Sequence, residues 1–456
     1  MIKKFPRCAV AIILLFSSAV PLATMAQADK EFYGRPSYWR PYDQRGINVF
    51  ETTKKPDSQA FEGPRVRLGA GFTQQFQDLK HESNALNNQA ANKLYPITPG
   101  FMTAMANLFT DIQLADGIRL NVTTYLSTRH HNEAWVKGGY IQFDKLPFKG
   151  PFWKKLMDVT TIKVGHMEIN YGDAHFRRSD GGQTLYNPFM ESYIMDAYAT
   201  EIGGEVFVQK NGLFGMLAVT NGMIKGNVDS AAKGVVNGDI VDANTKRSPS
   251  MILKAGIDKQ INENTRIRLS GSFYHNSSSA ASGLTLYGGD RSGSNYQNVI
   301  EKWKDANGAV QASTAIAFSG RLNPGFTKKI DAVMLNGFVK IGGIEAFGTY
   351  ETAKGRTKTE TANRKASQLA ADLVYRFGKT ENLFIGARYN TARAALAGIN
   401  DDVKIDRLAF AGGWFLTRNV MLKTEYVVQH YKDFPSADYR SGGKFSGYVV
   451  EAVVGF

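Results

Sequence analysis

Apolar and polar residues alternate along most of the chain, in segments of about ten residues bounded by Gly, Asn, Asp and Lys. Beyond residue 28 there is no apolar run of about 18 residues, which excludes a bundle of membrane-spanning helices. Alternation with period 2 is typical of a strand that has lipid on one side and water on the other. The sequence therefore predicts an all-β protein, a transmembrane antiparallel β-barrel.

The alternation indicates about sixteen strands, and fourteen or eighteen are also compatible with it. The connections are alternately short and long, as in barrels with short periplasmic turns and long outer loops. This scheme requires Asn276–Lys329 to be one long outer loop. The predicted strands lie near Arg65–Phe76, Ala106–Leu114, Ile118–Thr128, Trp135–Phe143, Thr160–Glu168, Glu201–Gln209, Leu213–Thr220, Ser250–Asp258, Arg266–Tyr274, Ile330–Ile341, Ile344–Glu351, Gln368–Phe377, Leu383–Asn390, Ile405–Phe415, Val420–Tyr431 and Lys444–Phe456.

Two hairpins set the register of neighbouring strands. Ala115–Gly117 is expected to be a three-residue turn, with Leu114 opposite Ile118. Gly342-Gly343 is expected to be a two-residue turn that brings the apolar residues of its two strands onto one face. That face is the one expected to meet lipid.

The first 28 residues have the features of a secretory signal peptide. Lys3, Lys4 and Arg7 precede the apolar core Ala9–Phe16, and Ala26–Ala28 fits a small-residue cleavage site. The three domains expected are a signal peptide at 1–28, a periplasmic or plug-like extension at 29–64, and the barrel at 65–456. The last predicted strand ends in an aromatic residue, like the terminal strand of barrels in the outer membrane of Gram-negative bacteria, which is the expected location.

The polar face of each strand is expected to line the lumen. A charged side chain on the lipid face would cost about 2–4 kcal/mol at mid-bilayer, so the charges are expected to point inward. These side chains either form a lattice of ion pairs or favour anions in transit, and the two roles are compatible. The pore-lining candidates are Arg65, Arg67, Arg119, Lys163, Lys254, Arg266, Arg268, Lys340, Arg376, Arg388, Lys423, Glu205, Glu345, Asp372 and Glu425.

The segment Ile169–Thr200 is the candidate for a constriction loop. It combines charged residues with an apolar and aromatic run, and a freely solvated loop gains nothing from exposing that run. Folding into the lumen is one interpretation, and packing on a neighbouring protomer or on the outer rim is the other. The constriction candidates are His175, Arg177, Arg178 and Asp180.

A short stretch of the chain resembles a known family. Thr161–His166, Gly172, Glu191 and Gly203–Glu205 resemble the phosphate-selective porins of the O and P type and related porin-like proteins of Bacteroidota. The resemblance implies a sixteen-stranded, trimeric diffusion channel.

The sequence thus predicts a homotrimeric outer-membrane porin for passive diffusion of small hydrophilic solutes, with a weak preference for anions. The alternative is an occluded barrel that serves as a structural or docking subunit of an envelope complex. No catalytic site, metal or cofactor is expected, and His130-His131 is interpreted as part of a solvated loop. Nucleic acid is not an expected partner, because the basic residues alternate into the lumen instead of forming an outer patch.

Overall fold

The computed structural model describes residues 39–55, 60–127, 134–179, 182–222, 232–236, 239–244, 247–279, 282–289, 292–312 and 317–456. The predicted signal peptide, His130-His131 and Asp180 lie outside these residues.

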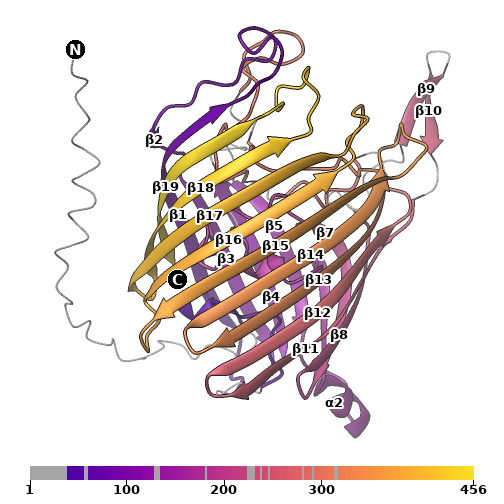
Figure 1. Ribbon diagram of the computed structural model, residues 1–456. Coiled ribbons are helices and arrows are strands. Elements are labelled where there is room, and N and C mark those ends of the chain that lie inside the picture. Colours follow the sequence, from indigo (N-terminus) through magenta and orange to yellow (C-terminus); the bar gives the residue numbers. More distant parts are fainter. Residues whose placement is uncertain are drawn as a thin grey trace.

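Sixteen antiparallel strands form a closed barrel, as the sequence predicts (Figure 1). The ring closes because β1 pairs with β3 on one side and with β19 on the other. The strands of the barrel are β1 (Arg65–Glu82), β3 (Met105–Ala115), β4 (Ile118–Ser127), β5 (Ala134–Phe143), β6 (Thr160–Glu168), β7 (Thr200–Lys210), β8 (Leu213–Thr220), β11 (Ser250–Asn262), β12 (Thr265–Asn276), β13 (Lys329–Ile341), β14 (Ile344–Arg356), β15 (Arg364–Phe377), β16 (Leu383–Ala394), β17 (Val403–Thr417), β18 (Val420–Lys432) and β19 (Lys444–Gly455).

The remaining elements are small. The two-residue strand β2 (Gly100–Phe101) adds to β1, and β9 (Ala232–Val236) and β10 (Asp239–Asn244) form a separate hairpin. The helices are η1 (Gln44–Gly46), α2 (Pro151–Met157) and η2 (Ala174–Arg177). None of the helices in the described part of the chain has the length and apolar character needed to cross a membrane.

Short and long connections lie at opposite ends of the barrel. The short turns and the carboxyl end share the lower end in Figure 1, and the long loops share the upper end. Two-residue turns join β3 to β4, β7 to β8, β11 to β12, β13 to β14 and β17 to β18. The lower end is therefore the periplasmic end.

The observed strand register agrees with the register predicted from the sequence at one hairpin and differs from it at the other. Around Gly342 the predicted pairing is confirmed, with Ile341 opposite Ile344. The predicted pairing of Leu114 with Ile118 is wrong, because Ala115 stands opposite Ile118. The register shifts between residues 113 and 115, so Leu114 is the extra residue of a β-bulge and the turn itself is only two residues long.

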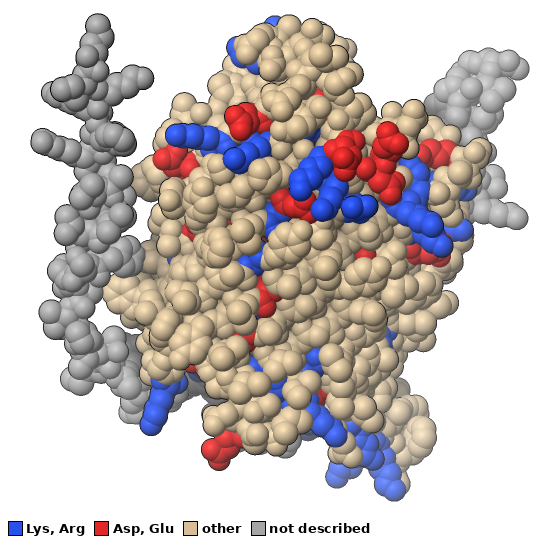
Figure 2. All heavy atoms as spheres, viewed as in Figure 1, with Lys and Arg blue, Asp and Glu red and all other residues tan. Residues whose placement is uncertain are grey.

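The outer wall is apolar. Along β14 every second residue is buried, and the residues between them include the exposed Ile344 and Tyr350. In Figure 2 uncharged atoms cover most of the wall, while charged side chains gather mainly towards its two ends. A closed sheet pairs its backbone polar groups within the wall, which is what lipid surroundings require. The protein is therefore a β-barrel of the outer membrane of a Gram-negative bacterium.

Candidate functional site

The connection between β6 and β7, here called the inner loop (residues 169–199), lies inside the barrel. Those of its residues that the structure describes, 169–179 and 182–199, are nearly all buried. Lys423 on β18 donates hydrogen bonds from Nζ to the carbonyl oxygens of Thr184 (3.1 Å), Asn187 (3.0 Å) and Phe189 (3.0 Å). One inward lysine thus fixes six residues of loop backbone against the wall.

Other inward side chains hold the second half of the inner loop. The backbone N–H of Ile194 donates to Asn390 (2.7 Å), and that of Met195 donates to Gln368 (2.8 Å). Arg388 donates to the carbonyl oxygen of Glu191 at 2.7 Å. These contacts satisfy buried backbone groups that have no strand partner.

The carboxylate of Glu191 joins the inner loop to the long outer loop (residues 277–328). It is fully buried, and it accepts hydrogen bonds from Arg321 (2.9 Å) and from the Ser294 hydroxyl (2.7 Å). Burial alone would raise the pKa of Glu191, but Arg321, Arg407 and hydrogen bonds from Ser294 and Asn295 outweigh it and lower the pKa to about 2. The two loops are therefore joined by an ionised group.

The N-terminal segment (residues 39–55) also lies inside the barrel. Asn48 donates to Glu345 on β14 at 2.6 Å. Glu51 forms ion pairs with Lys254 (2.9 Å) and Arg268 (2.8 Å), which project from β11 and β12. The same two cations bind Asp173 of the inner loop. The segment and the inner loop thus share one set of wall charges.

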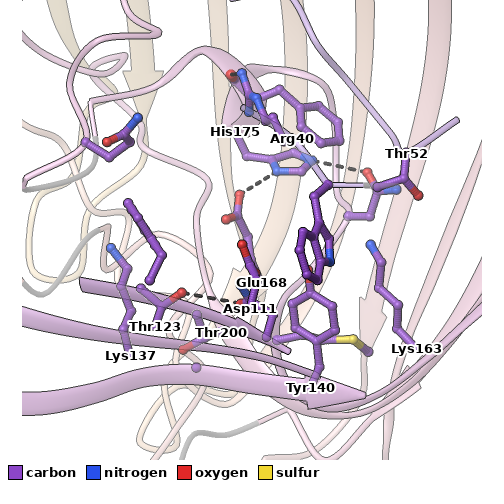
Figure 3. A pocket seen from close by; sticks show the side chains of 18 of the residues that line it. Arg40, Thr52, Asp111, Thr123, Lys137, Tyr140, Lys163, Glu168, His175 and Thr200 are labelled. Carbon is purple, nitrogen blue, oxygen red and sulfur yellow. Dashed lines mark hydrogen bonds and ion pairs between the residues drawn. The ribbon is translucent and has the colours of Figure 1, made fainter. Parts of the chain in front are cut away.

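A cavity of about 250 Å³ remains between the N-terminal segment, the inner loop and one side of the wall (Figure 3). Its wall residues come only from β1 and from β3–β7. On the other side, a space of about 20 Å³ lies between the inner loop and Met334, Gln368 and Arg388. The smaller space has room for about one water molecule, whereas the larger one admits a small solute.

Basic side chains outnumber acidic ones around the larger cavity. Arg67 is paired with Asp111, Lys163 lies 3.4 Å from Glu205, and Arg178 is paired with Asp196. Ion pairs therefore compensate part of the positive charge at the lining, and an excess of positive charge remains. The basic lining residues are Arg40, Arg67, Arg119, Lys137, Lys163 and Arg178, and the acidic ones are Glu51, Asp111 and Glu168.

Aromatic rings support several of these cations. The guanidinium of Arg40 lies 3.7 Å from the centre of the Tyr186 ring, and it donates to the carbonyl oxygens of Gly46 and Phe176. The guanidinium of Arg178 lies 3.9 Å from the ring of Tyr198. Stacking of this kind holds a guanidinium in place without neutralising its charge.

Lys137 reaches the cavity because of a β-bulge. Gly138 stands opposite Thr123, but Val136 stands opposite Thr124, so Lys137 is the extra residue. Strict alternation from Gln142 would turn Lys137 toward lipid, and the bulge turns it inward, where it is buried. Figure 3 shows Lys137 and Lys163 on opposite sides of the cavity.

Most of the sequence-predicted residues fall into three sets, and Glu205 and Arg65 lie outside them. Arg67, Arg119, Lys163, His175 and Arg178 line the cavity. The second set belongs to the ion-pair and hydrogen-bond network around the N-terminal segment and consists of Lys254, Arg266, Arg268, Lys340, Arg376, Glu345 and Arg177. The third set holds the inner loop and consists of Arg388, Asp372, Lys423 and Glu425. Glu205 stands beside Lys163, and Arg65 donates to the carbonyl of Ala60 at the periplasmic end.

Sequence reasoning missed several lining residues, among them Arg40, Lys137, Tyr140 and Glu168. Arg40 lies in a segment without strand alternation, and Glu168 is the last residue of its strand. For Lys137 the Gly138-Gly139 pair is the signal that could have indicated a bulge. Within the described ranges, no group of three or more His, Cys, Asp or Glu side chains is placed to hold a metal ion.

Comparison with known proteins gives distant structural likenesses. The sequence matches no protein-family model and no curated protein. The anion-selective porin from Comamonas acidovorans is 10% identical, covering 86% of this chain and 100% of that chain with a TM-score of 0.49. The trimer form of OmpT, an outer membrane protein of Vibrio cholerae, is 9% identical over 87% of this chain and 100% of that chain, with a TM-score of 0.48. The outer membrane channel DcaP of Acinetobacter baumannii is 10% identical over 87% and 99%, with a TM-score of 0.47.

Proposed function

We propose that this protein is an outer-membrane porin that lets small hydrophilic solutes diffuse through the cavity beside β1 and β3–β7. The observation that carries the proposal is the cavity of about 250 Å³ with a charged lining inside a closed barrel. A sixteen-stranded barrel is wide enough to enclose an aqueous channel. The inner loop and the N-terminal segment narrow that space, which restricts passage to small solutes.

A weak preference for anions is the second part of the proposal. Six basic and three acidic side chains line the cavity. In a low-dielectric wall such an excess attracts small anions and repels small cations. The preference is weak because carboxylates compensate several of the cations, such as Arg67 by Asp111. We also propose a homotrimer, in line with the resemblance described from the sequence.

Planar-bilayer recording of the purified protein tests this function. We expect small, discrete conductance steps and a reversal potential in a KCl gradient that favours chloride. Purified, correctly folded protein that inserts and conducts no current would contradict the proposal. A conducting channel that favours potassium would contradict only the anion preference.

A second candidate is an occluded barrel that acts as a structural or docking subunit of an envelope complex. The filled interior beside β11–β19 favours it, because Arg388, Lys423 and Glu425 are all bound to loop backbone there. Copurification with another envelope protein at fixed stoichiometry would support this candidate. A freely conducting homotrimer would argue against it.

A further inference from the structure

The connection between β5 and β6 differs from the other periplasmic connections. It spans residues 144–159 and contains α2, whereas the other turns at this end have two to five residues. Two neighbouring antiparallel strands need only a short turn to join them. The additional residues are therefore not required to close the barrel.

The helix α2 has an apolar face that is only partly covered. At 100° per residue, Phe152, Trp153, Leu156 and Met157 share one side of the helix. Met157 is buried, but Phe152 is 67% exposed and Leu156 is 38% exposed. Phe148, also exposed, lies 5.0 Å from the ring of Trp153, and Phe152 lies 5.2 Å from it. The result is a cluster of exposed rings at the end of the barrel.

The opposite side of the helix is basic. Lys154 and Lys155 lie on it, and Lys149 precedes it. All three are exposed, no ion pair joins them to another residue in the described part of the chain, and Asp158 at the C-cap of the helix is the one acidic residue between residues 145 and 159. Figure 2 shows basic side chains at the lower end of the molecule, where Figure 1 places α2.

The position of α2 matches the edge of the membrane. Thr160, three residues after the helix, pairs with Val208 on β7. Val208 and Leu213 are exposed on the outer wall at this end, so lipid reaches this level of the barrel. The C-terminal end of the helix therefore lies at the lower rim of the lipid-facing wall, next to the headgroups of the periplasmic leaflet.

We propose that residues 148–156 form a binding surface for anionic phospholipids of the periplasmic leaflet. Short amphipathic helices with aromatic rings on one side and lysines on the other lie in the membrane interface, with the rings in the acyl boundary. The lysines then face the phosphate groups, and each contributes roughly a fivefold preference for anionic over neutral lipid at low salt. The charge of the cluster is the argument for anionic headgroups over a neutral lipid or an apolar protein partner.

Quenching of Trp153 fluorescence by brominated lipids tests the proposal. The full-length protein is reconstituted in vesicles of phosphatidylcholine that contain either brominated phosphatidylglycerol or brominated phosphatidylcholine. The signal of Trp153 is the difference between the protein and its Trp153→Phe variant. We expect stronger quenching by brominated phosphatidylglycerol at low salt, with the difference reduced at high salt because the lysines are exposed.

Two triple variants separate this surface from general surface charge. K149S/K154S/K155S is expected to abolish the preference, and the control K210S/K259S/K379S, which changes three exposed lysines at or next to other periplasmic turns, is expected to keep it. Heat-modifiable migration in gels shows that each variant is folded. Equal quenching by the two lipids, or no quenching of Trp153 by either, would overturn the proposal. Loss of the preference in the control variant as well would also overturn it.

Discussion

Along β1 and β3–β7 inward side chains face a cavity of about 250 Å³, whereas along β11–β19 inward charged side chains such as Lys423, Arg388 and Arg376 are bound to loop backbone or to ion partners. Both walls carry Arg and Lys at inward positions of a similar alternating pattern. On the filled side a cation such as Lys423 donates to three carbonyl oxygens and pairs with Glu451 at 3.1 Å. On the cavity side Lys163 has Glu205 as its nearest acidic partner, and its side chain is 22% exposed. An inward charge is therefore available to a solute only where no loop covers it.

Removal of the inner loop is expected to have the largest effect on the difference between the two sides of the interior, because this loop fills the space beside β11–β19. Glu168 and Thr200 are paired across β6 and β7, so a four-residue Gly/Ser turn can replace residues 169–199 without moving either strand. Single-channel conductance should then rise several-fold, because a barrel of this size without its inner filling leaves an aqueous channel.

The control for that replacement shortens the exposed outer connection at residues 357–363, which joins β14 to β15. This variant should keep the conductance of the unmodified protein. If both variants conduct like the unmodified protein, the inner loop does not limit the current. The two sides of the interior would then not differ in their effect on conductance.

Acid should weaken the contact that Glu191 makes between the inner loop and the long outer loop. Arg321 and Arg407 outweigh the effect of burial and lower the pKa of this carboxyl to about 2, from an ordinary value of 4.5. A carboxyl with a lowered pKa stabilises the folded state above its unfolded pKa, and that contribution is lost as the pH falls from 4.5 through about 2. The contribution is about 3 kcal/mol. Conductance recorded from pH 7 to pH 2 should become larger and noisier below about pH 4 as the two loops separate.

The Glu191→Gln variant is the test of this assignment. It removes the charge without removing the side chain, so it should show loosened loops at pH 7 and a flatter response to acid. The Asp116→Asn variant is its matched control, because Asp116 forms an exposed ion pair with Lys145 at 2.7 Å, and such pairs contribute about 0–1 kcal/mol. The same acid response in wild type and in the Glu191→Gln variant would exclude Glu191 as the responding group.

The strands could be predicted from the sequence because lipid outside and water inside impose alternation residue by residue. All sixteen predicted segments overlap strands of the barrel, and the register at Gly342 follows from its turn. The bulges at Leu114 and Lys137 were missed, since one extra residue reverses the inward and outward positions beyond it without leaving a regular pattern.

The candidate site could be predicted only in part, because loops make it. Alternation places Arg388 and Lys423 inside the barrel, but it does not tell which carbonyl groups they bind. Those partners lie about 200 residues away in the sequence, in a segment without a repeating pattern. Contacts of this kind depend on the three-dimensional path of the loop. The cavity beside β1 and β3–β7 can therefore be located only once it is known that the inner loop occupies the space beside β11–β19.

The smallest expected effect concerns the selectivity of the cavity. Lys163→Gln removes one of six basic lining residues and leaves the carboxylate of Glu205 without its nearest cation, so the reversal potential in a KCl gradient should shift toward potassium. Lys423→Gln removes a lysine beside β11–β19, and because Lys423 does not line the cavity, the reversal potential should stay unchanged while the barrel loses about 3 kcal/mol of stability to urea. Equal shifts in the two variants would mean that all inward charges act on the solute alike, and the distinction between the two sides would then have no consequence for transport.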